Sequence, residues 1–144
     1  MSAAHDDQPW VDQQRPLVLS YLHGISVDHL GLGEWPAFYI RPIFAIWAVQ
    51  SKSRPGWVGW WAFSGDIPTD CVSRTNGNDD PRKALARLLD QWRRYIPHLE
   101  LGNNPPDVNI GSGNSRIALA GLLTKRIYLL ERWHKDDTIW QECL

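Results

Sequence analysis

The centre of the fold is indicated by the run Gly56-Trp57-Val58-Gly59-Trp60-Trp61-Ala62-Phe63-Ser64-Gly65-Asp66-Ile67-Pro68-Thr69-Asp70. Its first half is rich in aromatic residues, which favour β-strands, and its second half has the Gly, Asp and Pro residues of a turn. We therefore expect an aromatic strand over 57–63 that ends in two neighbouring carboxylates. Alternation of side chains along a strand would place Trp57, Gly59, Trp61 and Phe63 on one face, and Val58, Trp60 and Ala62 on the other.

A second strand is expected just before this one. Residues 43–49 are almost continuously apolar, which is typical of a strand that is covered on both faces. The short polar link 52–56 contains Pro and Gly, so an antiparallel hairpin is the natural pairing. Residues 71–73 can add a further short strand.

Helical patterns flank this hairpin. We expect four helices: 9–24, which Pro16 should kink or split; 81–96, capped by Asp80 and stopped by Pro97; 116–133, capped by Asn114 or Ser115; and a short last helix that begins at Asp137 and carries Trp140. The predicted class is α+β, with a small antiparallel sheet around a central aromatic hairpin packed against about four helices. Residues 1–8 are expected to form a disordered tail.

Length and composition restrict the class of protein. A chain of 144 residues is expected to form a single domain, 1–144. Its formal net charge of −1 argues against binding to a nucleic-acid backbone. It has no signal peptide and no apolar run long enough to span a membrane, so we expect a soluble, cytoplasmic protein without a membrane partner. The histidines and the two cysteines lack metal-ligand spacing, so no metal or cofactor is predicted.

Asp66 and Asp70 are the first candidates for chemistry. Two carboxylates four residues apart in a turn can perform acid–base catalysis if their environments separate their pKa values. Alternatively, each accepts backbone N–H groups and holds the turn. A third interpretation is an ion pair with an arginine such as Arg82, which would clip the loop to the following helix. Ser64 lacks the flanking glycine of a nucleophile elbow.

Several short motifs together resemble an uncharacterised bacterial family of small single-domain proteins, domain of unknown function 4826. They are Gly33-Glu34-Trp35-Pro36-Ala37, Ile46-Trp47-Ala48-Val49, Gly59-Trp60-Trp61, Ser64-Gly65-Asp66-x-Pro68-Thr69-Asp70, Pro81-Arg82-x-Ala84 and Leu122-Leu123-x-x-Arg126, with Trp133, Asp137 and Trp140. The resemblance implies a cytoplasmic bacterial protein. It implies no known activity and therefore no catalytic residues.

Two functional hypotheses follow, and they share the candidate binding residues Trp60, Trp61, Ser64, Asp66, Thr69, Asp70 and Arg82. The first is a non-catalytic protein of the immunity or antitoxin type that binds and blocks a protein partner such as a toxin. The second is a small enzyme or small-ligand binder that uses the two aspartates, with the loop 102–113 as a lid. We prefer the first because no group of residues supplies a nucleophile, a base and an orienting residue together. The sequence makes no prediction of the oligomeric state.

Overall fold

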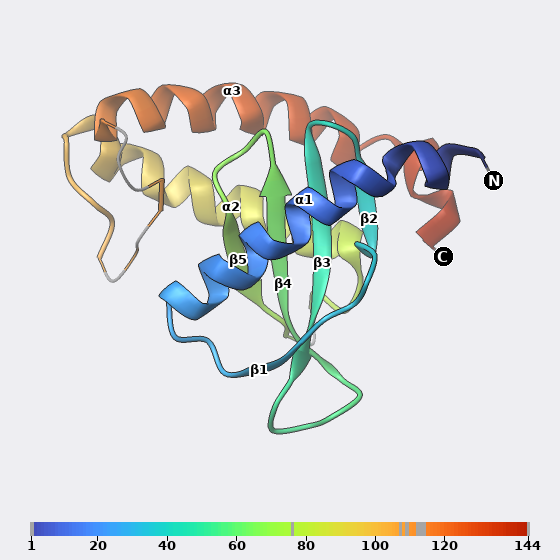
Figure 1. Cartoon of the computed structure of the whole chain (residues 1–144). Helices are drawn as coiled ribbons and strands as arrows, with labels where there is room; N and C mark the ends of the chain where they lie inside the picture. Colours follow the sequence, from blue (N-terminus) through green and yellow to red (C-terminus); the bar gives the residue numbers. More distant parts are fainter. Residues whose placement is uncertain (1, 76, 107, 109, 112–114, 144) are drawn as a thin grey trace. The chain divides into compact units, whose positions relative to one another are not determined.

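The computed structural model describes residues 2–75, 77–106, 108, 110–111 and 115–143 (Figure 1). Its elements are, in chain order, α1 (Ser2–Gly24), β1 (His29–Leu32), β2 (Phe38–Ile40), β3 (Phe44–Ser51), β4 (Val58–Gly65), β5 (Asp70–Ser73), α2 (Pro81–Glu100), α3 (Arg116–His134) and the 3-10 helix η1 (Asp137–Cys143). They fall into two compact units, Met1–Thr75 and Asn76–Leu144. That the whole chain is one domain stays a prediction.

The first unit contains a five-stranded antiparallel sheet. Its centre is the predicted hairpin: β3 pairs with β4 from Phe44 opposite Gly65 to Gln50 opposite Val58. The short β5 adds to the free edge of β4. The other edge of β3 is shared, since β2 pairs with its first half and β1 with its last residues. The hairpin and β5 were predicted, whereas the strand β1 was not.

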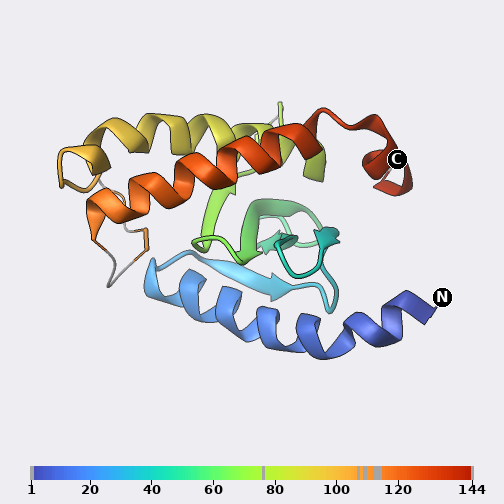
Figure 2. The same cartoon turned by 90° about the horizontal axis from the view of Figure 1, so that it is seen from above.

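Helix α1 covers one face of this sheet. Figure 1 shows it crossing in front of β3 and β4, and Figure 2 shows it along one side of the sheet, next to β1. The core between them is formed by Val11, Val18, Leu22, Leu32, Ala45, Trp47, Val49 and Ala62, with Trp60 among the partly buried residues packed against it. The predicted common face of Trp60 and Ala62 is therefore confirmed. Phe44 and Ile46, on the opposite face of β3, are buried as well, as the continuous apolar run indicated.

The N-terminal segment differs from the prediction. We expected the first helix to begin at residue 9, but α1 begins at Ser2. Side chains near its start are tied to the loop around β2, because the Tyr39 hydroxyl donates to Asp7 at 2.7 Å and Arg41 lies 3.2 Å from the same carboxylate. Burial, and then the Asp7 carboxylate, raise the pKa of Tyr39 to about 12. These long-range contacts offset the loss of chain entropy that would otherwise fray the helix end.

Two prolines inside helices also act differently from the prediction. Pro16 neither splits α1 nor ends it, and α2 continues past Pro97 instead of stopping there. In each helix, buried side chains lie beyond the proline: Val18 in α1 and Leu99 in α2 are completely buried. We infer that this burial offsets the one helical hydrogen bond that a proline removes.

The second unit is built on α2 and α3, which lie side by side in both views (Figures 1 and 2). Asp80 caps α2 by accepting the Lys83 N–H at 2.8 Å, and Ser115 caps α3 by accepting the Ala118 N–H at 3.3 Å, as predicted. Each helix buries an apolar stripe: Leu85, Leu88, Leu89 and Trp92 in α2, and Leu119, Leu123, Ile127 and Leu130 in α3.

The predicted number of helices is slightly too high. Within the described residues there are three α-helices, and the segment expected to be a fourth is the 3-10 helix η1. Seven residues are too few for a stable α-helix, whereas 3-10 turns are common in short pieces. The segment is held by Trp140, which is buried and donates its indole N–H to the Trp133 carbonyl at 2.9 Å.

Candidate functional site

The end of the sheet where β3 turns into β4 carries an exposed aromatic residue. We call residues 51–60 the hairpin end. Trp57 is 50% exposed there, and the Arg54 guanidinium carbon lies 4.1 Å from the centre of its ring. Two backbone hydrogen bonds shape the loop: Ser51 N–H donates to the Trp57 carbonyl at 2.8 Å, and Trp57 N–H to the Arg54 carbonyl at 3.0 Å. The cation–π contact and these bonds hold a large apolar surface in a fixed position facing solvent.

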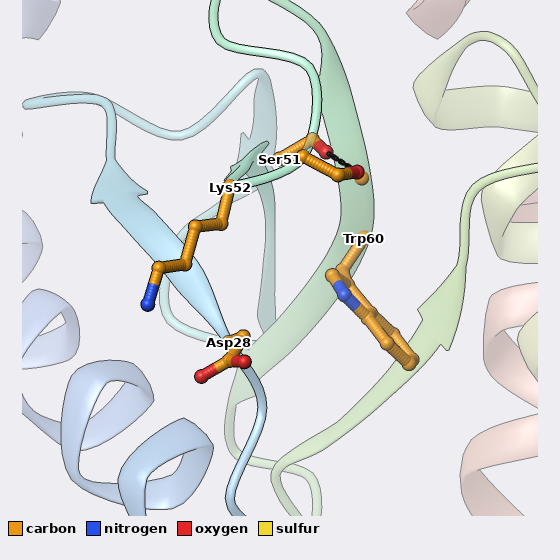
Figure 3. Close-up of a pocket in the computed structure, with 6 residues that line it drawn as sticks. Asp28, Ser51, Lys52 and Trp60 are labelled. Atoms are coloured by element: carbon orange, nitrogen blue, oxygen red, sulfur yellow. Dashed lines mark hydrogen bonds between the residues drawn. The ribbon is translucent and has the colours of Figure 1, made fainter.

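A depression of about 370 Å³ lies beside this loop (Figure 3). It is lined by Asp28, Ser51, Lys52, Ser53, Gly59 and Trp60. The pairing of His29 with Ser51 brings the preceding Asp28 to this place. A register shift after Val49 brings Gly59 against Ser51, where an added Cβ would lie 3.0 Å from the serine Cβ.

The polar side chains that line this depression form few hydrogen bonds and ion pairs with other described residues. The Ser51 and Ser53 hydroxyl oxygens lie 3.1 Å apart, and Ser51 Oγ also accepts the Arg54 N–H at 3.1 Å. Since a pair of hydroxyls uses one hydrogen for its mutual bond, the other remains available to a ligand. Asp28 and Lys52 are both exposed, and neither has an ion pair or a side-chain hydrogen bond with any other described residue.

Of the predicted site residues, Trp60 lies in this depression. Asp28, Ser51, Lys52 and Ser53 were not predicted. The hairpin pattern could have placed Ser51 and Lys52 near Trp60, because a short turn sets residues on its two sides opposite each other. Asp28 had no such signal, since the pairing of β1 with the end of β3 is a long-range contact.

The two aspartates of the turn have different environments. Asp70 is 4% exposed, and its Oδ1 accepts both the Tyr21 hydroxyl at 3.1 Å and the Cys71 N–H at 2.8 Å. Asp66 is exposed, and its N–H donates to the Ile43 carbonyl at 2.9 Å. The bonds of Asp70 support the interpretation that this carboxylate holds the turn and joins it to α1.

Three other predicted residues of the first unit are not on the hairpin end. Trp61 is 4% exposed and Ser64 is completely buried, where its Oγ accepts the Trp47 indole N–H at 3.1 Å. Thr69 is half-buried in the turn before Asp70. Ser64 therefore has a packing role that its position in the sequence motif did not reveal.

Arg82 belongs to the second unit, where its side chain forms a hydrogen bond and an ion pair. Its Nε donates to the His134 carbonyl at 3.0 Å, and its guanidinium lies 2.7 Å from the Asp137 carboxylate. The last carbonyls of a helix lack helical partners and attract cations, which explains why Arg82 caps α3. Arg82 thus links α2 to the end of α3 and the start of η1, whereas the third of our sequence interpretations paired it with the aspartate turn. Burial, and then the Arg82 charge, lower the pKa of His134.

The loop that we considered as a lid is described only in part, since 107, 109 and 112–114 lie outside the described residues. In the described part, Arg116 donates to the Asn104 side chain at 2.8 Å and to the carbonyls of Ile110 at 2.8 Å and Gly111 at 2.6 Å. These bonds fasten that part of the loop to the first turn of α3.

The thiol of Cys71 is expected to be unreactive in the folded protein. Burial, and then the neighbouring Asp70 carboxylate, raise its pKa to about 12. Because the thiolate is the reactive form, a Cys143→Ser variant should label with iodoacetamide at pH 8 at least tenfold more slowly when folded than when unfolded in urea. Adding Asp70→Asn should speed the labelling of the folded protein. Equal labelling rates in the folded and unfolded protein would contradict this environment.

The raised pKa also has a consequence for stability. The folded protein binds the Cys71 proton more tightly than the unfolded chain, whose thiol pKa is about 8.5. The stabilisation is therefore fully present below that value and is lost as the pH rises toward 12.

The described residues contain no group of three or more His, Cys, Asp or Glu side chains arranged to hold a metal ion. Among them, no helix is both long enough and apolar enough to cross a bilayer.

Comparison with known proteins gives one result. No curated protein and no solved structure matches this chain significantly. A family model described as Domain of unknown function (DUF4826) matches residues 4–140, which span both compact units and every described helix and strand in whole or in part. The chain therefore belongs to this family of unknown function.

Proposed function

We propose that this protein is a non-catalytic binding protein that holds a protein partner at its hairpin end. The observation that carries the proposal is the exposed Trp57, fixed beneath Arg54 at 4.1 Å. Trp and Arg are the residues that most often dominate the binding energy of protein interfaces, and a side chain that is already ordered loses little entropy on binding. A toxin that is blocked by an immunity-type protein in a bacterial cytoplasm is the concrete form that we propose.

The charge of the hairpin end suggests the chemistry of the partner. Lys52 and Arg54 both lie in the exposed turn, so the hairpin end carries two positive charges. Asp28 is the acidic residue of the adjoining depression. We therefore expect a partner surface with carboxylates around an apolar recess that receives Trp57.

This location replaces the centre that the sequence suggested. Asp70 is buried beneath Tyr21, and Arg82 is paired with Asp137, so neither side chain is presented as an interface anchor in the way we expected. The same burial disfavours the enzyme alternative, because a substrate would have to reach a carboxylate that is 4% exposed.

The test is affinity capture from the native host with tagged protein, followed by binding measurements on the purified pair. We expect one stoichiometric partner, with Trp57→Ala and Arg54→Ala each weakening its affinity at least tenfold. Tyr128→Ala is the matched control, because this aromatic residue is 69% exposed on α3 and should not affect binding. Asp66→Ala should also bind normally.

Two outcomes would contradict the proposal. One is a partner whose affinity changes less than twofold in both hairpin variants. The other is a partner that is lost in Asp66→Ala while circular dichroism shows that this variant is folded, since this would return the interface to the aspartate turn.

A further inference from the structure

The depression beside Trp60 brings together charges of both signs that are not neutralised by the protein. Asp28 and Lys52 line the same recess, yet they form no ion pair with each other or with other described residues. In Figure 3 the charged ends of both side chains extend to the same side of the view, while the indole ring of Trp60 points to the other side. The recess therefore has a charged part and an aromatic part.

This arrangement discriminates among small ligands by charge. A simple anion would be attracted by Lys52 but repelled by Asp28. A simple cation would be attracted by Asp28 but repelled by Lys52. A ligand that carries both charges can satisfy both side chains. The spare hydroxyl hydrogen of the Ser51–Ser53 pair adds a donor for a carboxylate oxygen.

We infer that this depression binds a small zwitterion, namely an α-amino acid with an aromatic or large apolar side chain. Its carboxylate contacts Lys52 and the serine hydroxyl, its ammonium contacts Asp28, and its side chain packs against Trp60. The volume of about 370 Å³ is at the lower end of the range of small-molecule sites, which suits a ligand of this size. This site goes beyond the proposed partner interface, because none of its ligand-binding groups is the Trp57–Arg54 pair.

The test follows the indole N–H of Trp60 by nuclear magnetic resonance in ¹⁵N-labelled full-length protein. The signal is assigned with Trp60→Phe. The probe is L-phenylalanine, compared with 3-phenylpropionate, which lacks the ammonium, and with phenethylamine, which lacks the carboxylate. We expect saturable shifts with L-phenylalanine and affinities about tenfold weaker with each analogue, since each loses one charge-assisted contact. Glucose, a neutral ligand that can also stack on tryptophan, should cause no saturable shift.

Two variants test the roles of the charged side chains in binding, and a third serves as a control. Lys52→Ala and Asp28→Asn should each weaken L-phenylalanine binding about tenfold. Asp28→Asn should also remove the preference for L-phenylalanine over 3-phenylpropionate, which a merely structural role of Asp28 would not do. Lys125→Ala, which removes an exposed lysine of α3, is the matched control and should bind normally.

The inference is overturned if L-phenylalanine at millimolar concentration leaves the Trp60 signal unmoved. It is also overturned if L-phenylalanine and its two analogues bind equally, or if glucose binds more tightly. Trp57→Ala should bind L-phenylalanine as the unchanged protein does. This variant separates the two proposals, because it should weaken binding of the protein partner at least tenfold and leave the zwitterion site intact.

Discussion

Replacing Trp47 by alanine should lower the free energy of unfolding by about 3–5 kcal/mol, the range for truncating a large buried aromatic residue. Trp47 is completely buried in the core between α1 and the sheet. Its indole N–H donates to Ser64 Oγ at 3.1 Å, so the alanine variant would create a large cavity and leave a buried hydroxyl without its partner. Urea unfolding followed by far-ultraviolet circular dichroism measures the effect without relying on tryptophan fluorescence.

Two matched variants separate the causes of this loss. Ser64→Ala keeps the packing but leaves the indole N–H unpaired, which should cost about 1–3 kcal/mol. Trp57→Ala removes a half-exposed tryptophan and should change the stability by no more than about 0.5 kcal/mol. A Trp47→Ala variant that is no less stable than Trp57→Ala would contradict the position of Trp47 in the core.

Gly65→Ala should be the most damaging single change at a glycine, with a loss of about 3 kcal/mol or more from strain and steric overlap combined. Gly65 has a φ of +127°, a conformation that is essentially restricted to glycine. A Cβ there would lie 2.5 Å from the Ile43 carbonyl oxygen and 2.8 Å from Phe44 Cα. Both atoms belong to the backbone, so the end of the β3–β4 ladder would have to move apart.

Gly56→Ala is the control for this prediction. Gly56 also has a positive φ, +88°, but nothing lies within 4 Å of an added Cβ. The free energy of unfolding of Gly56→Ala should therefore fall only by the cost of the backbone conformation, about 1 kcal/mol. The same urea titration measures both variants, and equal losses would show that the close approach of Gly65 to β3 contributes nothing.

The elements that could be predicted are those whose signals are local. The apolar run 43–49, the turn 52–56 and the aromatic run after it lie next to each other in the chain, so their pairing needs only a short loop closure. The starts of α2 and α3 could also be predicted, because a capping side chain accepts a hydrogen bond from a backbone N–H only three residues further along the chain.

The errors arise where distant segments contact each other. The helical start of α1 depends on Asp7 meeting Tyr39 and Arg41, which are more than thirty residues away. The continuation of the helices past Pro16 and Pro97 coincides with tertiary burial of the turns that follow, and tertiary contacts commonly override local preference. Local patterns contain no information about these partners.

The candidate site shows the same division. Local sequence patterns were enough to predict that an aromatic hairpin would be central and that Trp60 would share a face with Ala62. Long-range contacts, by contrast, account for the hydrogen bond of the buried Asp70 with Tyr21 and for the attachment of Arg82 in α2 to the end of α3 and to Asp137. Likewise, it was the pairing of β1 with the end of β3 that placed Asp28 beside Lys52 and Trp60. This difference arises because hydrophobic periodicity and turn chemistry fix which face of an element is buried, whereas a binding site depends on which distant elements share an edge.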